Sequence, residues 1–137
     1  MSFPIPVVRA ILEDSEGRIL LLRRRGRVAD GLWCLPGGKV NYNQTVERAV
    51  LEEVKEETRL GIDNLTFLFY QDGLPEGERG MHCIHLYFSG NPTGTLSLNG
   101  ESSEAHWVSP DEFRNYPIAF GNDEAVIQYL SEKRNHR

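Results

Sequence analysis

The sequence predicts an α+β fold, specifically an α/β/α sandwich in which a mixed β-sheet lies between helical layers. Two observations lead to this class. Apolar runs of strand length, bounded by turn residues, recur along most of the chain, whereas only two or three segments have helical periodicity. Because many strands and few helices pack well as a sheet covered on its faces, we expect the strands to form the centre of the molecule.

The first predicted strands lie near the N-terminus. Residues 7–12 and 19–24 are apolar runs with strand composition. Between them, residues 14–17 (Asp-Ser-Glu-Gly) supply turn residues, so the two runs are expected to be separate strands. Residues 25–31 are expected to be a loop. Residues 32–35 form a short apolar stretch that ends at a Pro-Gly-Gly sequence.

Helices and further strands follow along the chain. Residues 46–58 are predicted to be a helix. The other expected strands are residues 65–70, 82–88 and 105–108. A short helix is expected from Pro110, because Ser109 to Glu112 has the form of a capping box with proline at the first helical position. The last helix is expected at residues 123–133, where apolar residues recur on one face.

Composition excludes several broad classes of protein. With 137 residues, 39% of them hydrophobic and 26% charged, the chain suits one globular domain spanning residues 1–137. The net charge of −5 argues against a nucleic-acid partner, which would favour a basic face. No apolar run approaches the roughly 20 residues of a membrane span, and the first residues lack the features of a signal peptide. We therefore expect no membrane partner and a cytoplasmic location.

The predicted helix at residues 46–58 carries carboxylates on its apolar side. Its apolar stripe consists of Val46, Ala49, Val50 and Val54. At about 100° per residue, Glu53 and Glu57 fall inside this stripe and Glu56 lies at its border. Buried carboxylates are costly unless they are paired or bind a metal, and these three also repel each other along the helix. A divalent cation resolves both problems, and oxygen ligands favour Mg²⁺ or Mn²⁺. The alternative is a solvated acidic face, which the position of the stripe disfavours.

Two segments around this helix resemble the Nudix box. They are residues 35–40, Leu-Pro-Gly-Gly-Lys-Val, and residues 53–58, Glu-Val-Lys-Glu-Glu-Thr. The family pattern is G-x5-E-x7-R-E-U-x-E-E-x-G-U, where U is a bulky aliphatic residue. The chain matches it without a gap at Gly38, Glu53, Val54, Glu56, Glu57 and Leu60. Residues 107–113 also resemble a stretch that many members carry before their last helix. The chain therefore looks like a small single-domain, MutT-like member with a variant box, which implies a Nudix-like fold.

Three positions depart from the family pattern. Gln44 replaces its first glutamate, Glu52 replaces its arginine and Arg59 replaces its late glycine. The arginine matters most, because in the family it pairs with a box glutamate and orients it. Glu52 cannot do this and adds a negative charge beside the other carboxylates. Arg48, Lys55 or Arg59 could supply the missing positive charge, and the sequence leaves these alternatives open.

The resemblance implies a metal-dependent chemistry. Nudix hydrolases use Mg²⁺, with Mn²⁺ as an alternative, to cleave the diphosphate linkage of a nucleoside diphosphate derivative. By residue match, the expected metal ligands are Gly37, Glu53, Glu56, Glu57 and Glu101, and the expected catalytic residues are Glu53 and Glu56. The catalytic base is open between Glu53 and Glu101. For Glu101, a solvated loop carboxylate is an equally reasonable interpretation.

Four residues are candidates for binding substrate. Arg24, at a strand end, could hold phosphate or stack on a base, and Gly38 and Lys39 lie in the loop before the helix. Asn122 occupies the place of a base-reading asparagine in the family's oxidised-guanine triphosphate pyrophosphatases. It is also a natural N-cap for the last helix, and we favour capping. Triphosphates, ADP-ribose, nucleotide sugars and dinucleoside polyphosphates all stay open as substrates, with a slight preference for a purine nucleotide.

The main functional prediction is therefore a Mg²⁺-dependent Nudix pyrophosphohydrolase that binds a small-molecule nucleotide, as a monomer or a homodimer. The alternative is a non-catalytic nucleotide-binding or regulatory module with a degenerate box, which Gln44 and Glu52 favour. Retention of the three box glutamates disfavours it, because a helix without metal would be more stable without them. A third class, an interaction protein with an acidic helix, explains neither the glycine pair nor the spacing.

Overall fold

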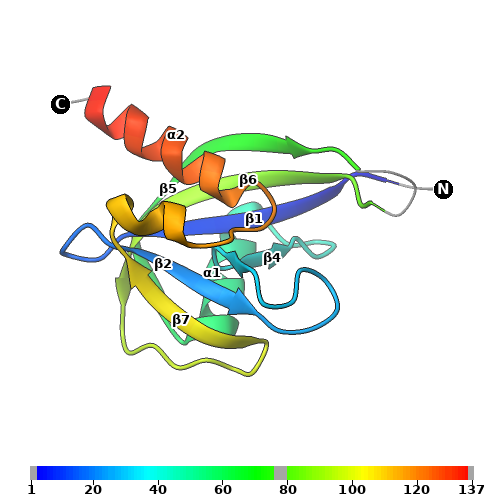
Figure 1. Ribbon diagram of the computed structural model, residues 1–137. Helices are drawn as coiled ribbons and strands as arrows, with labels where there is room; N and C mark the ends of the chain where they lie inside the picture. The colour runs from blue at the N-terminus through cyan, green and yellow to red at the C-terminus, as the bar shows by residue number, and fades with distance from the viewer. Residues whose placement is uncertain (1–2, 76–79, 136–137) are drawn as a thin grey trace.

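The strands of the protein divide between two sheets packed between two α-helices, as seen in a computed structural model (Figure 1) that describes residues 3–75 and 80–135. The first sheet has the order β4-β1-β6-β5 and the second has the order β3-β2-β7. The strands are β1 (Ile5–Leu12), β2 (Ile19–Arg24), β3 (Trp33–Cys34), β4 (Gly37–Lys39), β5 (Gly61–Gly73), β6 (Cys83–Thr93) and β7 (Ser102–Val108). The helices are α1 (Val46–Thr58), the short 3₁₀ helix η1 (Pro110–Asn115) and α2 (Asn122–Asn135).

The first sheet is mixed, as predicted. β1 runs parallel to β6, whereas β4 and β5 pair antiparallel with their neighbours. The prediction of one central sheet was too simple, because β1 and β2 share only the isolated bridge between Glu13 and Ile19. The two strands separate after this bridge, and β2 pairs with β3 and β7 instead. All four of the first residues of β2 are buried, so this strand needs packing partners on both faces.

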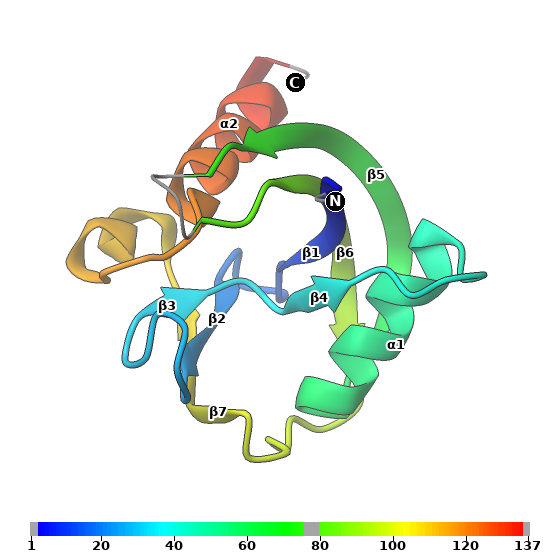
Figure 2. The same cartoon turned by 90° about the vertical axis from the view of Figure 1, so that its right-hand side faces the viewer.

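Two apolar cores lie on opposite faces of the strands. On one face, Val8, Ala10 and Leu12 of β1 pack in a cluster that includes the apolar stripe of α1. On the other face, Ile11 packs in a cluster with residues of η1 and α2. Strand alternation produces this division, since successive side chains of a strand point to opposite faces. Figure 2 shows the strands lying between α1 and α2, which confirms the predicted α/β/α sandwich.

The ends of α1 show how the chain defines this helix. The hydroxyl of Thr45 caps the first turn by accepting from the backbone N–H of Arg48 at 3.2 Å. The helix ends at Arg59, which has a φ of 66° in the left-handed region. A glycine adopts this conformation without strain, which explains the glycine of the box pattern at this position. Arg59 adopts it at a cost of roughly 1–2 kcal/mol, so this departure leaves the helix boundary intact.

Several element boundaries differ from the prediction. β5 and β6 extend well beyond the predicted 65–70 and 82–88, because each continues where it pairs with the other. β4 was not predicted, since a glycine pair has low strand propensity. The short helix predicted from Pro110 is confirmed as η1, but the Ser109 side chain makes no capping hydrogen bond.

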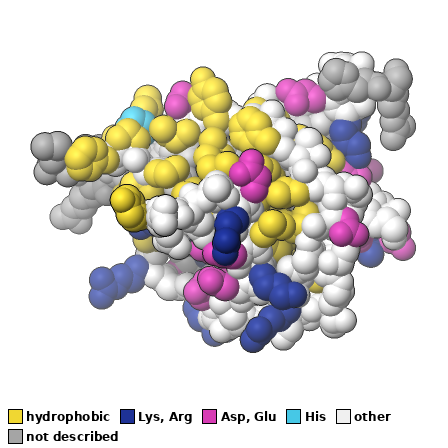
Figure 3. Space-filling view, turned by 180° about the vertical axis from the view of Figure 1, so that it is seen from behind, with side chains coloured by type: hydrophobic (Ala, Val, Ile, Leu, Met, Phe, Trp, Pro, Cys, Tyr) yellow, Lys and Arg dark blue, Asp and Glu magenta, His cyan; other side chains and the backbone are white. Residues whose placement is uncertain are grey.

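The outer face of β5 presents apolar surface. β5 is an edge strand of the first sheet, and Phe67 and Tyr70 on it are 51% and 64% exposed. Figure 3 shows hydrophobic side chains gathered on this side of the molecule, with charged side chains below them. In residues 3–75 and 80–135, no helix has both the length and the apolar character needed to cross a membrane.

Candidate functional site

The box helix carries its carboxylates into the protein, as the sequence predicts. Ala49, Val50 and Val54 dock α1 against the strands, and this orientation buries Glu57, which is only 8% exposed. The backbone N–H of Gly37 donates to Oε1 of Glu57 at 3.0 Å. Glu53, one turn earlier, is half-buried, and the next box carboxylate on the helix, Glu56, is exposed. The three box carboxylates of the helix therefore differ in burial, from the buried Glu57 through the half-buried Glu53 to the exposed Glu56.

The glycine pair of β4 lets this helix approach closely. Gly37 and Gly38 pair with Arg9 and Val8 of β1. A Cβ at Gly37 would collide with the backbone carbonyl of Val8, and a Cβ at Gly38 would lie 2.5 Å from Oε2 of Glu53. Neither position tolerates a side chain without movement of its neighbours. The pair therefore forms a cradle of backbone atoms beside the Glu53 and Glu57 carboxylates.

Burial and mutual repulsion place these carboxylates under electrostatic stress. Burial raises the pKa of Glu57 from its ordinary value of 4.5 to about 8, although the hydrogen bond from Gly37 opposes this shift. Burial also raises the pKa of Glu53, and repulsion from Glu56 and Glu101 adds to the effect. Glu101, which precedes β7, therefore lies within electrostatic range of α1, although it is distant in sequence. The four carboxylates that the sequence predicts as ligands therefore lie within electrostatic range of this end of the site, around Glu53.

These residues fit a divalent cation in their chemistry. All are oxygen donors, one is nearly inaccessible to solvent, and the backbone beside them has no side chain in the way. Among the residues that the structure describes, no three His, Cys, Asp or Glu side chains already converge as a metal-holding group. Exposed Glu56 and half-buried Glu53 have flexible side chains, so convergence requires rotation about side-chain torsions. A bound cation would compensate the repulsion that raises the pKa of Glu53.

The departures at Gln44 and Glu52 contact each other. The side-chain amide of Gln44 donates to Oε2 of Glu52 at 2.6 Å and accepts from the backbone N–H of Asn41 at 2.8 Å. Arg48 forms an ion pair with Oε1 of Glu52 at 2.9 Å. Hydrogen bonds from Arg48 and Gln44 lower the pKa of Glu52. Of the three candidate cations, Arg48 is thus the one that pairs with Glu52, and this exposed group ties the loop before α1 to the helix.

We expect Glu52→Arg alone to bring no gain in activity. The new arginine would lie beside Arg48 and take from Gln44 its acceptor, so the loop contact is lost. The double variant Gln44→Glu/Glu52→Arg restores an opposite pair at the same positions. Initial hydrolysis rates and melting temperatures of the wild type, both single variants and the double variant test this coupling. A faster rate in Glu52→Arg alone would show instead that the charge of Glu52 weakens the site.

The predicted substrate-binding residues have different surroundings. Nε of Arg24 donates to the carbonyl of Val28 at 2.9 Å, and its guanidinium lies 4.9 Å from the centre of the Phe120 ring. Lys39 is exposed at the end of β4. Gly38 lies against Glu53, as described above. The assignment of these residues to substrate binding stays a prediction.

Asn122 does not make the predicted capping contact. It is fully buried, and its Oδ1 accepts from the backbone N–H of Leu35 at 2.9 Å. Its Nδ2 donates to the hydroxyl of Tyr87 at 3.1 Å. The side-chain oxygen of Asn122 therefore accepts from Leu35, which is distant in sequence, and not from an N–H of the first turn of α2. This contact joins the start of α2 to the residues before the glycine pair.

Sequence reasoning missed three residues beside this region. Arg9 of β1 is 7% exposed, His85 of β6 is 5% exposed, and the Phe120 ring lies near both. The available signal for Arg9 was a lone arginine within an otherwise apolar strand. For Phe120 the sequence offers no comparable signal, because its place depends on the fold of the loop before α2.

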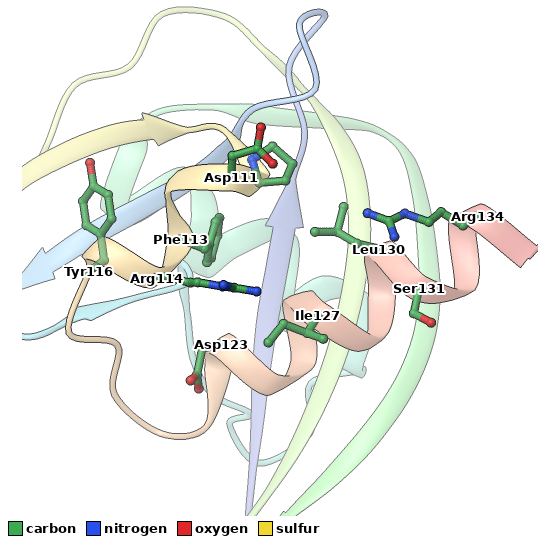
Figure 4. Close-up of a pocket in the computed structure, with 10 residues that line it drawn as sticks. Asp111, Phe113, Arg114, Tyr116, Asp123, Ile127, Leu130, Ser131 and Arg134 are labelled. Atoms are coloured by element: carbon green, nitrogen blue, oxygen red, sulfur yellow. The ribbon is translucent and has the colours of Figure 1, made fainter.

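A separate cavity of about 720 Å³ lies between η1 and α2 (Figure 4). Its lining includes Phe113 and Arg114 from η1 and Ile127, Leu130 and Arg134 from α2. None of the predicted site residues lines this cavity. It is therefore distinct from the carboxylate cluster of α1.

The sequence is similar to a known family and to characterised proteins. The family model for the NUDIX domain matches residues 4–129. An ADP-ribose pyrophosphatase from Methanocaldococcus jannaschii is 31% identical over 132 residues, which cover 95% of this chain and 75% of that protein. A CTP pyrophosphohydrolase from Escherichia coli is 33% identical over 116 residues, covering 84% of this chain and 83% of that protein.

A solved structure shows the same architecture. The crystal structure of a MutT NUDIX hydrolase from Burkholderia pseudomallei superimposes with a TM-score of 0.85 and 27% identity, covering 93% of this chain and 98% of the other. On the evidence of its sequence, its fold and these relatives, the chain belongs to the Nudix hydrolase family.

Proposed function

We propose that this protein is a Mg²⁺-dependent pyrophosphohydrolase that cleaves the diphosphate linkage of a nucleoside di- or triphosphate derivative, and that Mn²⁺ can replace Mg²⁺. The observation that carries the proposal is the burial of Glu57 against the N–H of Gly37, with Glu53 packed on Gly38. A buried carboxylate beside other carboxylates costs folding free energy unless a cation binds there. The metal-dependent reaction of the family would account for these buried carboxylates, because they would hold its cation.

Each part of the site has a task in this proposal. Glu53, Glu56 and Glu57, with the carbonyl of Gly37 and with Glu101, would hold the cation. The bound cation supplies charge neutralisation at the diphosphate oxygens and acidifies water. Either of the two candidates for the catalytic base, Glu53 or Glu101, would accept the proton of the attacking water. The buried hydrogen bond from Gly37 holds the carboxylate of Glu57 in one orientation, which preorganises the site.

The substrate is a small nucleotide in this proposal, and its base is the open question. The two similar proteins named above act on ADP-ribose and on CTP by their names, so the relatives span different bases and leaving groups. Arg24, Lys39 and Asn122 are the substrate-binding candidates of this chain. Asn122 is buried and already engaged by Leu35 and Tyr87, so its effect on a base would act through the position of its neighbours.

A panel of nucleotides tests the reaction and the substrate class together. We expect release of a nucleoside monophosphate from at least one of ADP-ribose, CTP, 8-oxo-dGTP, a nucleotide sugar and a dinucleoside polyphosphate, with Mg²⁺ present. Chromatography identifies the products and shows which phosphorus bond breaks. Chelation of the metal should stop the reaction, and renewed Mg²⁺ should restore it. Tight nucleotide binding without hydrolysis of any member would contradict the proposal and favour a non-catalytic binding module.

A further inference from the structure

Arg9 is a buried cation in the middle of β1. It is 7% exposed and lies between the fully buried Val8 and the nearly fully buried Ala10. Within residues 3–75 and 80–135, it forms no ion pair with a carboxylate. A buried charge without such a partner costs free energy, and an apolar residue at the same place would be easier to fold around. The position therefore calls for an explanation outside folding stability.

The hydrogen bonds of Arg9 leave part of its guanidinium unused. Nη1 donates to the carbonyl of Leu35 at 3.0 Å and lies 3.9 Å from Sγ of Cys34. Nε is buried and, among the described residues, has no hydrogen-bond partner. Buried donors almost always have a partner, because an unpaired one loses its hydration without compensation. The same condition holds for Nδ1 of His85, which is also buried.

The surroundings of Arg9 combine a second cation with the carboxylate cluster. Its guanidinium lies 5.1 Å from the centre of the Phe120 ring, and Arg24 lies 4.9 Å from the same centre. Arg9 is also close enough to Glu53 and Glu57 to oppose the rise in their pKa. Burial, together with Arg9, lowers the pKa of His85 to about 4, so this neighbour is neutral near pH 7. The guanidinium groups of Arg9 and Arg24 thus both lie near the Phe120 ring, and Arg9 is paired in the sheet with Gly37 of the glycine cradle.

We propose that Arg9, with Arg24, binds a phosphate group of the nucleotide next to the Gly37–Gly38 cradle. This inference rests on the proposed function, which places a diphosphate at the carboxylates. A phosphate is the anion that a guanidinium binds through paired N–H groups and that a neighbouring divalent cation also binds. It would give Nε its missing acceptor and compensate the buried charge. The alternative role, bracing the carbonyl of Leu35, requires a donor but no positive charge.

Binding of inorganic pyrophosphate tests this role without dependence on the base or on turnover. The variants are Arg9→Met, Arg9→Lys and, as a matched control, Arg114→Met, an exposed arginine of η1. Titration calorimetry with Mg²⁺ present should show roughly 10- to 100-fold weaker pyrophosphate binding for Arg9→Met. Arg9→Lys should fall between it and the wild type, because the ammonium keeps the charge but loses the planar fork. Arg114→Met should bind as the wild type does.

Stability and metal binding separate a phosphate contact from a structural brace. The melting temperature of Arg9→Met should equal or exceed that of the wild type, and its Mg²⁺ affinity should be unchanged or higher, since a nearby cation is gone. Wild-type pyrophosphate affinity in Arg9→Met, or no measurable pyrophosphate binding to the wild type, would overturn the proposal. A lower melting temperature in both Arg9 variants with unchanged affinity would assign Arg9 to bracing. Hydrolysis by the wild type in the nucleotide panel would stand in each of these cases, so the two proposals can fail separately.

Discussion

Glu57→Gln is expected to reduce hydrolysis by roughly 100-fold or more while the metal-free protein becomes more stable. Glutamine keeps an oxygen that can accept from the N–H of Gly37, so the local geometry survives. It removes a charged metal ligand. Mutation of a residue that merely supports a metal ligand typically lowers metal affinity or activity by about 10- to 100-fold, so loss of the ligand itself should lower activity at least as much. Initial rates at saturating Mg²⁺ measure the first effect. Glu47→Gln, an exposed carboxylate in the first turn of the same helix, is the control.

The stability effect has a definite pH window. Burial raises the pKa of Glu57 from 4.5 to about 8, so the folded state holds this proton more tightly than the unfolded state. Its contribution to stability is therefore lost as the pH rises from about 4.5 to about 8 in metal-free protein. Glu57→Gln removes this dependence, and its melting temperature should exceed that of the wild type increasingly across the window. A lower melting temperature throughout, with chelator present, would show that Glu57 stabilises the fold by itself.

Gly37→Ala and Gly38→Ala are expected to fail for different reasons. A methyl group at Gly37 would collide with the backbone of Val8, so β1 and β4 must separate and the variant should lose stability. The atoms nearest to a methyl group at Gly38 would be those of the flexible carboxylate end of Glu53. This variant should fold but hold a displaced carboxylate, and a misplacement of about 1 Å can reduce a rate by about 100-fold.

Melting curves and initial rates distinguish the two glycine variants. Gly37→Ala should melt well below the wild type, whereas Gly38→Ala should melt near it and have a much slower rate. Gly100→Ala is a useful comparison, because no atom within 4 Å would obstruct its Cβ, although its φ of 101° strains any side chain. Full activity in Gly38→Ala would contradict the placement of Glu53 in the site.

Local sequence information was sufficient for the box helix. Residues 46–58 were predicted and observed with the same boundaries, because the apolar spacing lies within the segment and the capping residues Thr45 and Arg59 directly flank it. The strands were harder. The length of β5 and the division into two sheets depend on partners that are distant in sequence, such as β6 and β7. Periodicity within one segment carries no information about which partner that segment will pair with.

The same distinction applies to the site. The spacing of Glu53, Glu56 and Glu57 placed them on one side of α1, and the structure agrees for the buried Glu57 and the half-buried Glu53. The contact between Gln44 and Glu52 crosses a loop, so neither residue alone showed that the two departures are coupled. This contact also weakens the case for a degenerate box, since the charge of Glu52 is paired with Arg48 on the exposed side of the helix.

Tertiary partners explain the remaining differences. Asn122 was predicted to cap the last helix, but its side-chain oxygen accepts from the backbone N–H of Leu35 instead. This contact forms because Asn122 is fully buried against the residues before the glycine pair. A lone arginine in an apolar strand does not by itself indicate a buried charge, because its stem can lie along apolar surface while the guanidinium stays in water. The burial of Arg9 between β4 and β6 follows from the sheet order, which residue spacing does not reveal.

The central claim is that the carboxylates of α1 bind a divalent cation on which hydrolysis depends, and one titration tests it most directly. Initial rates of nucleoside monophosphate release are measured against Mg²⁺ concentration for the wild type and Glu57→Gln, with the best substrate of the panel. We expect no rate without metal, a saturable rise in the wild type, and a rise in the variant that is far weaker and shifted to higher Mg²⁺. Equal metal dependence in the two proteins, or a wild-type rate that persists under chelation, would contradict it.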